Sequence, residues 1–311
     1  MLIKKPKFWD QKKPNLFSYI LLPLTWIVVF LNFFKKKNKK KIDRIKTICV
    51  GNIYIGGTGK TPLCIKINTI LNNLNYKTAF IKKKYFEQID EQILLKNNGK
   101  LICEKNRIQA IKIAIKDNVD VAILDDGLQD TKIGYDLSFV CFNIKKWIGN
   151  GFLIPSGPLR EKINNIKKYD AAFLNGNGED VASIKEVLFK IKPNLNIFQT
   201  LYSPINIEKF NLNENYLVFS GIGNPETFLD TLKKNKFKIT KQINFPDHYN
   251  FSNEDIKKIK EEAKKNNCKI ITTEKDYNRL SKINSNEIDF LKIQLEIINE
   301  KEFIDYLVKK L

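Results

Sequence analysis

The sequence predicts an α/β protein that contains a parallel sheet flanked by helices. From Lys46 onward, short apolar runs alternate with amphipathic stretches, which is the pattern of strands joined by crossover helices. The expected buried strands are TICVGN, TAFI, VDVAILDD, LSFVCF and AAFLN, and the expected helices between the earlier ones are TPLCIKINTILNNLN and RIQAIKIAIKDN. A second series of strands and helices begins near residue 215 with NYLVFSGIG and predicts a smaller C-terminal α/β domain.

The chain is expected to have three parts. Its 311 residues, 43% of them apolar, are enough for a core in each of two domains. Segment 201–215 is polar and irregular and holds Pro204, which is typical of a domain junction. We therefore expect an N-terminal segment over residues 1–44, a larger domain over 45–200 and the smaller domain over 201–311.

The apolar run NLFSYILLPLTWIVVFLNFF, residues 15–34, predicts an N-terminal membrane-associated helix. As one helix it would be about 30 Å long, the thickness of the hydrocarbon layer of a bilayer. Lysines flank the run, and Tyr19 and Trp26 carry rings favoured near lipid headgroups. A lysine cluster stands where a signal peptide would have its small-residue cleavage site. Pro23 would kink a spanning helix, so spanning, interfacial and buried core geometries all stay open.

The formal net charge of +20 would suit nucleic acid, an anionic membrane or a phosphorylated substrate as partner. Lysine, asparagine and isoleucine are abundant throughout, so a drift in composition explains the charge as well as binding does. The chain lacks zinc-finger spacings, basic zippers and aromatic RNA-binding signatures, and we expect no nucleic-acid partner. Its five cysteines lack a C-x-x-C spacing, which is typical of small buried hydrophobes in a reducing compartment. The single histidine, His248, excludes a zinc site built from several imidazoles.

The segment GNIYIGGTGKTP, residues 51–62, predicts a phosphate-binding loop of the P-loop NTPase type. A strand that ends in a glycine-rich turn before a helix gathers backbone N–H groups around one point, which suits phosphate oxygens. The usual pattern G-x-x-x-x-G-K-[ST] fails at Tyr54, but GGTGKT keeps its inner half. We expect ATP as cofactor, with Lys60 on its outer phosphates. The expected nucleotide-binding residues are Gly56, Gly57, Thr58, Gly59, Lys60 and Thr61.

The segment VDVAILDDGLQD, residues 119–130, predicts the acidic element that accompanies such a loop. An apolar strand that ends in two carboxylates has the form of a Walker B segment, which places Asp125 or Asp126 beside magnesium. Asp-Asp-Gly is also a common turn, and its place after a predicted strand favours the metal. The expected Mg2+ ligands are Thr61, Asp125 and Asp126.

Seven motifs in order resemble the tetraacyldisaccharide 4'-kinase family, and the resemblance covers nearly the whole chain. They are LLPLTWIVV, VGNIYIGGTGKTP, DDGLQD, LIPSGPLREK, FSGIGNPETF, FPDHYNFS and TTEKDYNRL. The resemblance implies ATP-dependent phosphorylation of the 4'-hydroxyl of an acylated glucosamine disaccharide 1-phosphate, giving lipid IVA in lipid A biosynthesis. It also implies a membrane lipid surface at the cytoplasmic face of the bacterial inner membrane as the place of work, without an obligate protein partner.

The resemblance assigns catalytic roles to four residues. Lys60 belongs to the ATP loop, and Arg160 of GPLRE matches an arginine near the active site, where a guanidinium would hold a phosphate by two hydrogen bonds. A surface ion pair with Glu161 is the alternative for Arg160. His248 matches a histidine that works with a carboxylate base, and the nearest match to that base is Asp90 in QIDEQILL. Alternatively, His248 is an ordinary turn residue and Asp90 a solvated acid at a helix start.

Two departures from the family pattern affect these assignments. The family's serine-arginine-glycine-tyrosine stretch after the second strand is replaced by IKKKYFEQ, with residues missing before Asp90. Asp130 stands where the acidic motif of the family ends in histidine.

The alternative function is a membrane-associated P-loop ATPase switch of the partitioning type, without a glycolipid substrate. Such switches share GGTGKT, but they carry a lysine where this chain has Ile55, and they lack GPLRE and PDHY. A GTP switch is disfavoured because the chain has no N-K-x-D motif.

Overall fold

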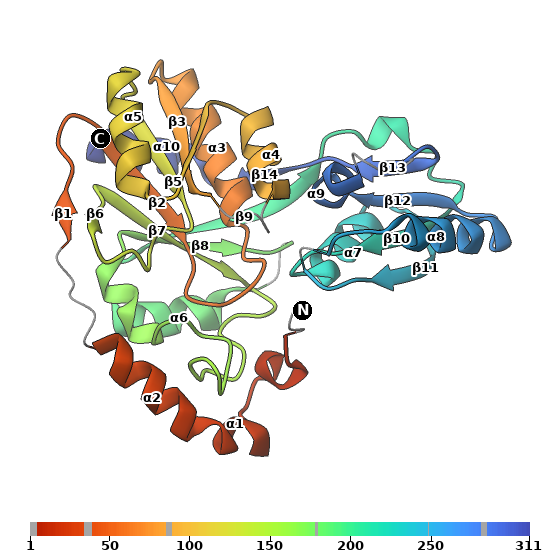
Figure 1. Cartoon of the computed structure of the whole chain (residues 1–311), viewed down its shortest axis with the longest axis horizontal. Helices are drawn as coiled ribbons and strands as arrows, with labels where there is room; N and C mark the ends of the chain where they lie inside the picture. The colour runs from red at the N-terminus through yellow and green to blue at the C-terminus, as the bar shows by residue number, and fades with distance from the viewer. Residues whose placement is uncertain (1–4, 34–38, 85–88, 178–179, 248, 281–284) are drawn as a thin grey trace. The chain divides into compact units, whose positions relative to one another are not determined.

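The computed structural model describes residues 5–33, 39–84, 89–177, 180–247, 249–280 and 285–311. Two compact units make up the chain. The larger contains Lys5–Lys84, Gly99–Leu201 and Ile297–Leu311, and the smaller is formed mainly by Tyr202–Glu296. The order of helices and strands along the chain is shown in Figure 1.

A parallel sheet forms the centre of the larger unit. Its strands are β2 (Lys46–Gly51), β3 (Thr78–Lys83), β4 (Leu101–Glu104), β5 (Val121–Asp125), β7 (Leu137–Asn143), β8 (Ala171–Asn175) and β9 (Asn196–Pro204). They lie in the order β9-β8-β7-β2-β5-β3-β4, with parallel neighbours, and β14 (Ile293–Ile297) adds an edge strand beside β9. In β5 and β7 every residue is buried. Such continuous burial is expected of parallel strands with helices on both faces.

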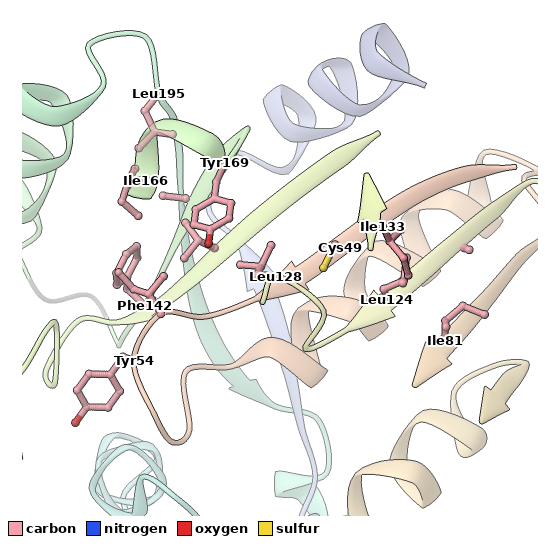
Figure 2. Packing of buried hydrophobic residues seen from close by; sticks show 14 of the residues in the cluster. Cys49, Tyr54, Ile81, Leu124, Leu128, Ile133, Phe142, Ile166, Tyr169 and Leu195 are labelled. Carbon is pink, nitrogen blue, oxygen red and sulfur yellow. The ribbon is translucent and has the colours of Figure 1, made fainter. Parts of the chain in front are cut away.

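Helices cover both faces of this sheet. On one face, α5 (Arg107–Lys116) and α6 (Ala182–Ile191) pack on a cluster of buried residues that includes Cys49, Leu124 and Phe142. Figure 2 shows part of this cluster, with side chains from the strands and from the loops after them. On the other face, Phe303 of α10 (Glu300–Lys310) contacts the rings of Phe139, Phe173 and Phe198. An ion pair of 2.6 Å between Lys66 and Glu300 joins α3 (Lys60–Asn73) to α10.

The smaller unit is built on a second parallel sheet. Its strands β10 (Asn215–Ser220), β11 (Lys238–Asn244), β12 (Lys269–Thr273) and β13 (Ile288–Leu291) lie in the order β11-β10-β12-β13. Helix α8 (Asn253–Lys265) packs its buried Ile256 and Ile259 against Leu217 and Phe219 on one face. On the other face, Phe228 and Leu232 of α7 (Pro225–Lys234) pack against Tyr216 and Val218.

One helix joins the smaller unit from a distant part of the sequence. Helix α4 (Ile89–Asn97) follows β3 along the chain, yet it packs against α9 (Glu274–Tyr277) and the 3-10 helix η5 (Asn278–Leu280). Among the residues that the structure describes, the smaller unit is therefore assembled from two separate stretches of sequence.

The N-terminal segment belongs to the larger unit. It contains the 3-10 helix η1 (Lys7–Asp10) and two helices, α1 (Leu16–Ile20) and α2 (Leu22–Phe33), that meet at Leu21. Strand β1 (Lys40–Lys41) then pairs with β6 (Ile133–Gly134). Thr25 Oγ1 lies 2.7 Å from Ser156 Oγ, and Asn150 Nδ2 donates to Ser18 Oγ at 2.9 Å, so α1 and α2 are held against loop 150–156.

Among the described residues, no helix has the length and apolar character needed to cross a bilayer. The apolar side chains of α1 and α2 are mostly exposed, with Trp26 at 70% and Phe17 at 63%. For residues 16–30 the structure therefore disagrees with a buried core helix. Within that range the buried residues are the polar Ser18 and Thr25.

The predicted fold class is confirmed: an α/β protein with a P-loop type parallel sheet, flanking helices and a smaller α/β unit. Membrane association of the N-terminal helices stays a prediction. The expected strands TICVGN, VDVAILDD and LSFVCF correspond to β2, β5 and β7.

We predict that Phe303→Ala lowers the free energy of unfolding by about 3–5 kcal/mol, because it leaves a cavity among three phenylalanine rings. Phe303 is fully buried. Urea denaturation followed by far-UV circular dichroism measures the change. Val308→Ala on the same helix is the control, because Val308 is exposed. Equal midpoints for the two variants would contradict the packing of α10 described above.

Candidate active site

The phosphate loop lies between the C-terminal end of β2 and the start of α3. Gly56 has φ of 114° and Gly59, the N-cap of α3, has φ of 87°. Both values lie in the left-handed region that favours glycine. Lys60 and Thr61 then open the helix, where free backbone N–H groups and the helix dipole favour an anion.

Buried side chains hold the loop from inside. Asn52 Nδ2 donates to Gly56 O at 3.2 Å and to Thr58 Oγ1 at 3.0 Å. Asn175 at the end of β8 donates to Thr58 O. Asn52, Thr58 and Asn175 are each at most 2% exposed. The loop is therefore preorganised by amide side chains at its own start and two strands away.

Tyr54 is accommodated because the outer half of the loop is held by a neighbouring segment. Tyr54 forms an antiparallel bridge with Leu159. Ile55 N donates to Pro158 O at 2.9 Å, and Arg160 N donates to Ile53 O at 2.6 Å. The positive φ values of the loop fall at Gly56 and Gly59, so position 54 accepts a side chain. Its hydroxyl bonds to Asp10 and, at 2.6 Å, to Lys5.

The two carboxylates at the end of β5 have different partners. Asp125 is buried, and its Oδ2 accepts hydrogen bonds from Thr61 Oγ1 at 3.1 Å and from Lys82 Nζ at 2.6 Å. Asp126 has φ of 59° and accepts two hydrogen bonds from Arg160 Nη1, at 3.0 and 3.2 Å. Lys60 Nζ lies 4.0 Å from Asp126 Oδ1. The turn thus aims one carboxylate at the start of α3 and the other at the GPLRE segment.

Charge around Asp126 favours its ionised form. Burial alone would raise the pKa of this carboxyl, but the nearby Lys60 and Arg160, with Lys82, lower it below its ordinary value. The arrangement therefore presents an ionised carboxylate beside the loop at neutral pH.

Gly127 completes the turn because a side chain does not fit there. An added Cβ would lie 2.8 Å from Tyr135 Oη and 2.9 Å from Cys49 Sγ. The carbonyl of Asp126 accepts a hydrogen bond from Arg107 Nη2 at 2.6 Å, and Arg107 Nη1 reaches Asp130 at 3.4 Å. Asp130 is thus a partner of Arg107.

The oxygen groups beside the loop fit a magnesium ion. Asp125 Oδ1 is buried and has no hydrogen-bond partner among the described residues, so one carboxylate oxygen is left for a ligand. Carboxylate and hydroxyl oxygens are the donors that Mg2+ prefers, together with substrate phosphates. Thr61, Asp125 and Asp126 supply such oxygens on one side of the phosphate loop.

Asp90 lies in the smaller unit, on α4, in a network of buried charges. Arg279 Nη2 donates to Asp90 Oδ2 at 2.7 Å, and Lys275 Nζ lies 3.2 Å from the same oxygen. Arg279 Nη1 also donates to Asp276 Oδ1 at 2.7 Å and to Gly221 O at 2.8 Å. Asp90 is 3% exposed, so it is a buried, paired acid and not a solvated one. The motifs TTEKDYNRL and FSGIG therefore meet at Arg279, which also holds the Asp90 carboxylate.

The comparison with known proteins decides the family. The model of the tetraacyldisaccharide-1-P 4'-kinase family matches residues 17–95 and 87–311 of the chain. The chain belongs to this family. It is 54% identical over 309 residues to the tetraacyldisaccharide 4'-kinase of Pelagibacter ubique, covering 99% of this chain and 98% of the relative. The Rickettsia bellii tetraacyldisaccharide 4'-kinase is 34% identical over 323 residues, which cover 98% of each chain.

A solved structure has the same fold. The crystal structure of LpxK from Aquifex aeolicus in complex with ATP aligns with a TM-score of 0.68 at 21% identity. The alignment covers 95% of this chain and 99% of that one.

The structure brings most of the predicted site residues of this family member together in the larger unit. Gly56, Gly57, Thr58, Gly59, Lys60 and Thr61 form the loop, with Asp125, Asp126 and Arg160 beside it. Arg160 pairs with Asp126, not with Glu161, whose carboxylate accepts hydrogen bonds from Gln129, Asn165 and Tyr169. Asp90 is described within the smaller unit, and His248 lies outside the described residues.

Sequence reasoning did not single out several residues at these sites. Asn52 and Gln129 lie within the motifs VGNIYIGGTGKTP and DDGLQD, but the motifs did not indicate a role for either residue. Gln129 Nε2 donates to Asn52 O and to Glu161 Oε1, each at 2.8 Å, and so ties the acidic turn to the loop and to GPLRE. Lys82 and Arg279 were not singled out because the chain has many lysines and arginines, and its sequence does not distinguish a buried basic residue from an exposed one.

We predict that Arg279→Met lowers the free energy of unfolding by about 3–5 kcal/mol, because it leaves the buried carboxylates of Asp90 and Asp276 without their main partner. Thermal and urea unfolding measure the loss. Lys258→Met is the control, since Lys258 pairs with Glu254 on an exposed helix surface, where ion pairs contribute little. A variant as stable as the control would show that Arg279 does not hold these acids.

Proposed function

We propose that this protein transfers the terminal phosphoryl group of ATP to the 4'-hydroxyl of tetraacyldisaccharide 1-phosphate, an acylated glucosamine disaccharide, to give lipid IVA. The observation that carries the proposal is the family match over nearly the whole chain, with 54% identity to a tetraacyldisaccharide 4'-kinase. The phosphate loop and acidic turn provide the groups that phosphoryl transfer requires.

The loop is the proposed ATP site. Backbone N–H groups around Gly56–Thr61 and the start of α3 hold phosphate oxygens, while Lys60 places its charge against the outer phosphates. Thr61, Asp125 and Asp126 are the proposed ligands of Mg2+, and their oxygens fit that ion. Magnesium bound there supplies positive charge against the β- and γ-phosphate oxygens during transfer.

Arg160 is the proposed second cation on the transferring phosphoryl group. Its guanidinium is held beside the loop, because Arg160 N donates to Ile53 O and Nη1 bonds Asp126. Arginine suits this role because its planar fork presents several donors to phosphate oxygens. The backbone hydrogen bond between Arg160 and Ile53 thus positions the Arg160 side chain so that its guanidinium lies beside the phosphate loop.

Asp90 is the proposed acceptor of the proton from the sugar hydroxyl, with His248 as its partner. Phosphoryl transfer has a loose transition state, so a carboxylate that positions the hydroxyl and accepts its proton late is sufficient. Arg279 and Lys275 keep Asp90 in one place within its unit.

The N-terminal helices are the proposed contact with the membrane. Soluble helices bury their apolar side chains, but α1 and α2 reverse this: Ser18 and Thr25 are buried and the surrounding aromatic and aliphatic side chains face outward. Lys12 and Lys13 before the helices and Lys39–Lys41 after them are exposed, which suits anionic headgroups. A protein on the lipid surface meets its acylated substrate there.

The proposed location is the cytoplasmic face of the bacterial inner membrane. ATP is a cytoplasmic substrate, and the five cysteines are unpaired thiols, as expected in a reducing compartment.

The experiment that tests the function follows transfer of label from [γ-32P]ATP to defined acylated disaccharide 1-phosphates. We expect product only when the glycolipid is present, and none with Lys60→Ala. Lys66→Ala on the same helix is the matched control, because Lys66 pairs with Glu300. ATP hydrolysis that ignores the glycolipid would favour a partitioning-type switch, which the family match does not support.

We predict that Asp90→Asn lowers kcat by about 10²- to 10⁴-fold, the usual contribution of a general base, with little change in ATP affinity. Steady-state kinetics and binding of a non-hydrolysable ATP analogue separate the two quantities. Glu91→Gln is the control, since Glu91 is the neighbouring acid and lies 3.4 Å from Lys275. Unchanged kcat in Asp90→Asn would place the base at another residue.

We predict that the double variant Phe17→Glu with Trp26→Glu binds anionic lipid vesicles at least about tenfold more weakly, because each ring loses a favourable burial of about 1.5–3 kcal/mol. Vesicle co-sedimentation measures binding. Val308→Glu is the control, as it adds a charge at an exposed apolar residue of α10. Equal sedimentation of both variants would show that the membrane contact lies outside α1 and α2.

A further inference from the structure

Lys82 is a buried lysine for which the proposed reaction gives no role. It lies near the end of β3, one residue after Ile81, which is in register with Leu124 of the neighbouring β5. Lys82 therefore reaches Asp125, which follows Leu124. The side chains are 2% and 0% exposed, and Nζ lies 2.6 Å from Asp125 Oδ2.

Stability alone does not account for this pair. Burying two charges costs about as much as their attraction returns, and well-packed apolar residues of similar volume are often at least as stable. We therefore expect the buried Lys82 to influence how the Asp125 carboxylate binds a ligand.

The two oxygens of Asp125 are used differently. Oδ2 is taken by protein donors, Lys82 Nζ and Thr61 Oγ1. Oδ1 is buried and has no hydrogen-bond partner among the described residues. The carboxylate is thus held by one oxygen, and the other is left for a ligand.

The charge of Lys82 affects what Asp125 can bind. Lys82 Nζ lies 2.6 Å from Asp125 Oδ2, and Lys60 and Arg160 lie within 4.0 Å of Asp126. A cation held against a carboxylate favours an anion such as a polyphosphate nearby and disfavours a free divalent cation on the same carboxylate.

We propose that Lys82 is a built-in counter-ion for Asp125, which holds this carboxylate in place before nucleotide arrives and prevents free Mg2+ from binding to it. ATP, whose negative phosphates offset the positive charge held at Asp125, would then bring magnesium to the site. Lys82 is in this sense a positioning residue that selects the metal–nucleotide complex over the metal alone. The inference rests on the proposed function, in which Asp125 is a magnesium ligand.

The test is magnesium binding without nucleotide, measured by isothermal titration calorimetry and by thermal unfolding in MgCl2, with KCl at equal ionic strength as reference. We expect Lys82→Gln to gain affinity for free Mg2+ of at least about tenfold over the wild type, equivalent to about 1.4 kcal/mol. Its melting temperature should rise with MgCl2, while that of the wild type stays unchanged. Lys82→Arg, which keeps the charge, should resemble the wild type. Lys66→Gln is the control for loss of a lysine.

Equal responses of the wild type and Lys82→Gln to MgCl2 would overturn the proposal. If Lys82→Gln does not fold, the double variant Lys82→Met with Asp125→Asn removes both charges. The proposal expects the melting temperature of the double variant to be unchanged by MgCl2, because the carboxylate is gone, and a rise equal to that expected of Lys82→Gln would overturn it. Binding of a non-hydrolysable ATP analogue to the wild type is measured in parallel. Loss of that binding would contradict the proposed kinase function, whereas intact binding with equal magnesium responses contradicts only the role of Lys82.

Discussion

The pairing of β2 with β5 fixes where the chemistry of this protein lies. Val50, the penultimate residue of β2, is in register with Asp125, the last residue of β5. Parallel strands end at the same edge, so the phosphate loop that follows β2 and the acidic turn that follows β5 emerge side by side. Asp126 N also donates to Val50 O at 2.8 Å, which bonds the turn to the strand below the loop. Thr61 and Asp125, 64 positions apart in the chain, meet for this reason.

Much of the fold was predictable from apolar pattern alone. β5 and β7 are buried throughout and β2 is buried from Thr47 to Gly51, so these strands are mostly apolar runs that stand out in the sequence. The apolar run near the N-terminus carried a signal of another kind: Pro23 lies in the first turn of α2, where proline is tolerated, and the two helices meet just before it at Leu21. Another feature gave no signal in the sequence. Helix α4 joins the smaller unit through contacts with α9 and η5, which depend on tertiary packing that no local pattern reports.

The candidate site also contains some residues that sequence motifs predicted and others that they did not. Lys60, Thr61, Asp125 and Asp126 follow from motifs, because their chemistry requires fixed residue types next to strand ends. Lys82 does not, since a lysine in the run IKKKYF looks like a solvated strand end. Its burial follows from its place in the sheet. Asp90 was predicted from the family resemblance, but its pairing with Arg279 was not, because the two residues are 189 positions apart and meet only in the folded unit.

Tyr54 connects the phosphate loop to the beginning of the chain. Its hydroxyl bonds to Asp10 and Lys5, and Lys146 lies 3.4 Å from Asp10. Lys5 and Asp10 come shortly before the outward-facing helices α1 and α2 in the sequence. A shortened protein that lacks its first forty or so residues, the usual route to a more soluble enzyme, would therefore also lose the supports of its nucleotide loop. Inactivity of such a truncation would reflect a loosened loop as much as lost lipid contact, and point substitutions on α1 and α2 separate the two causes.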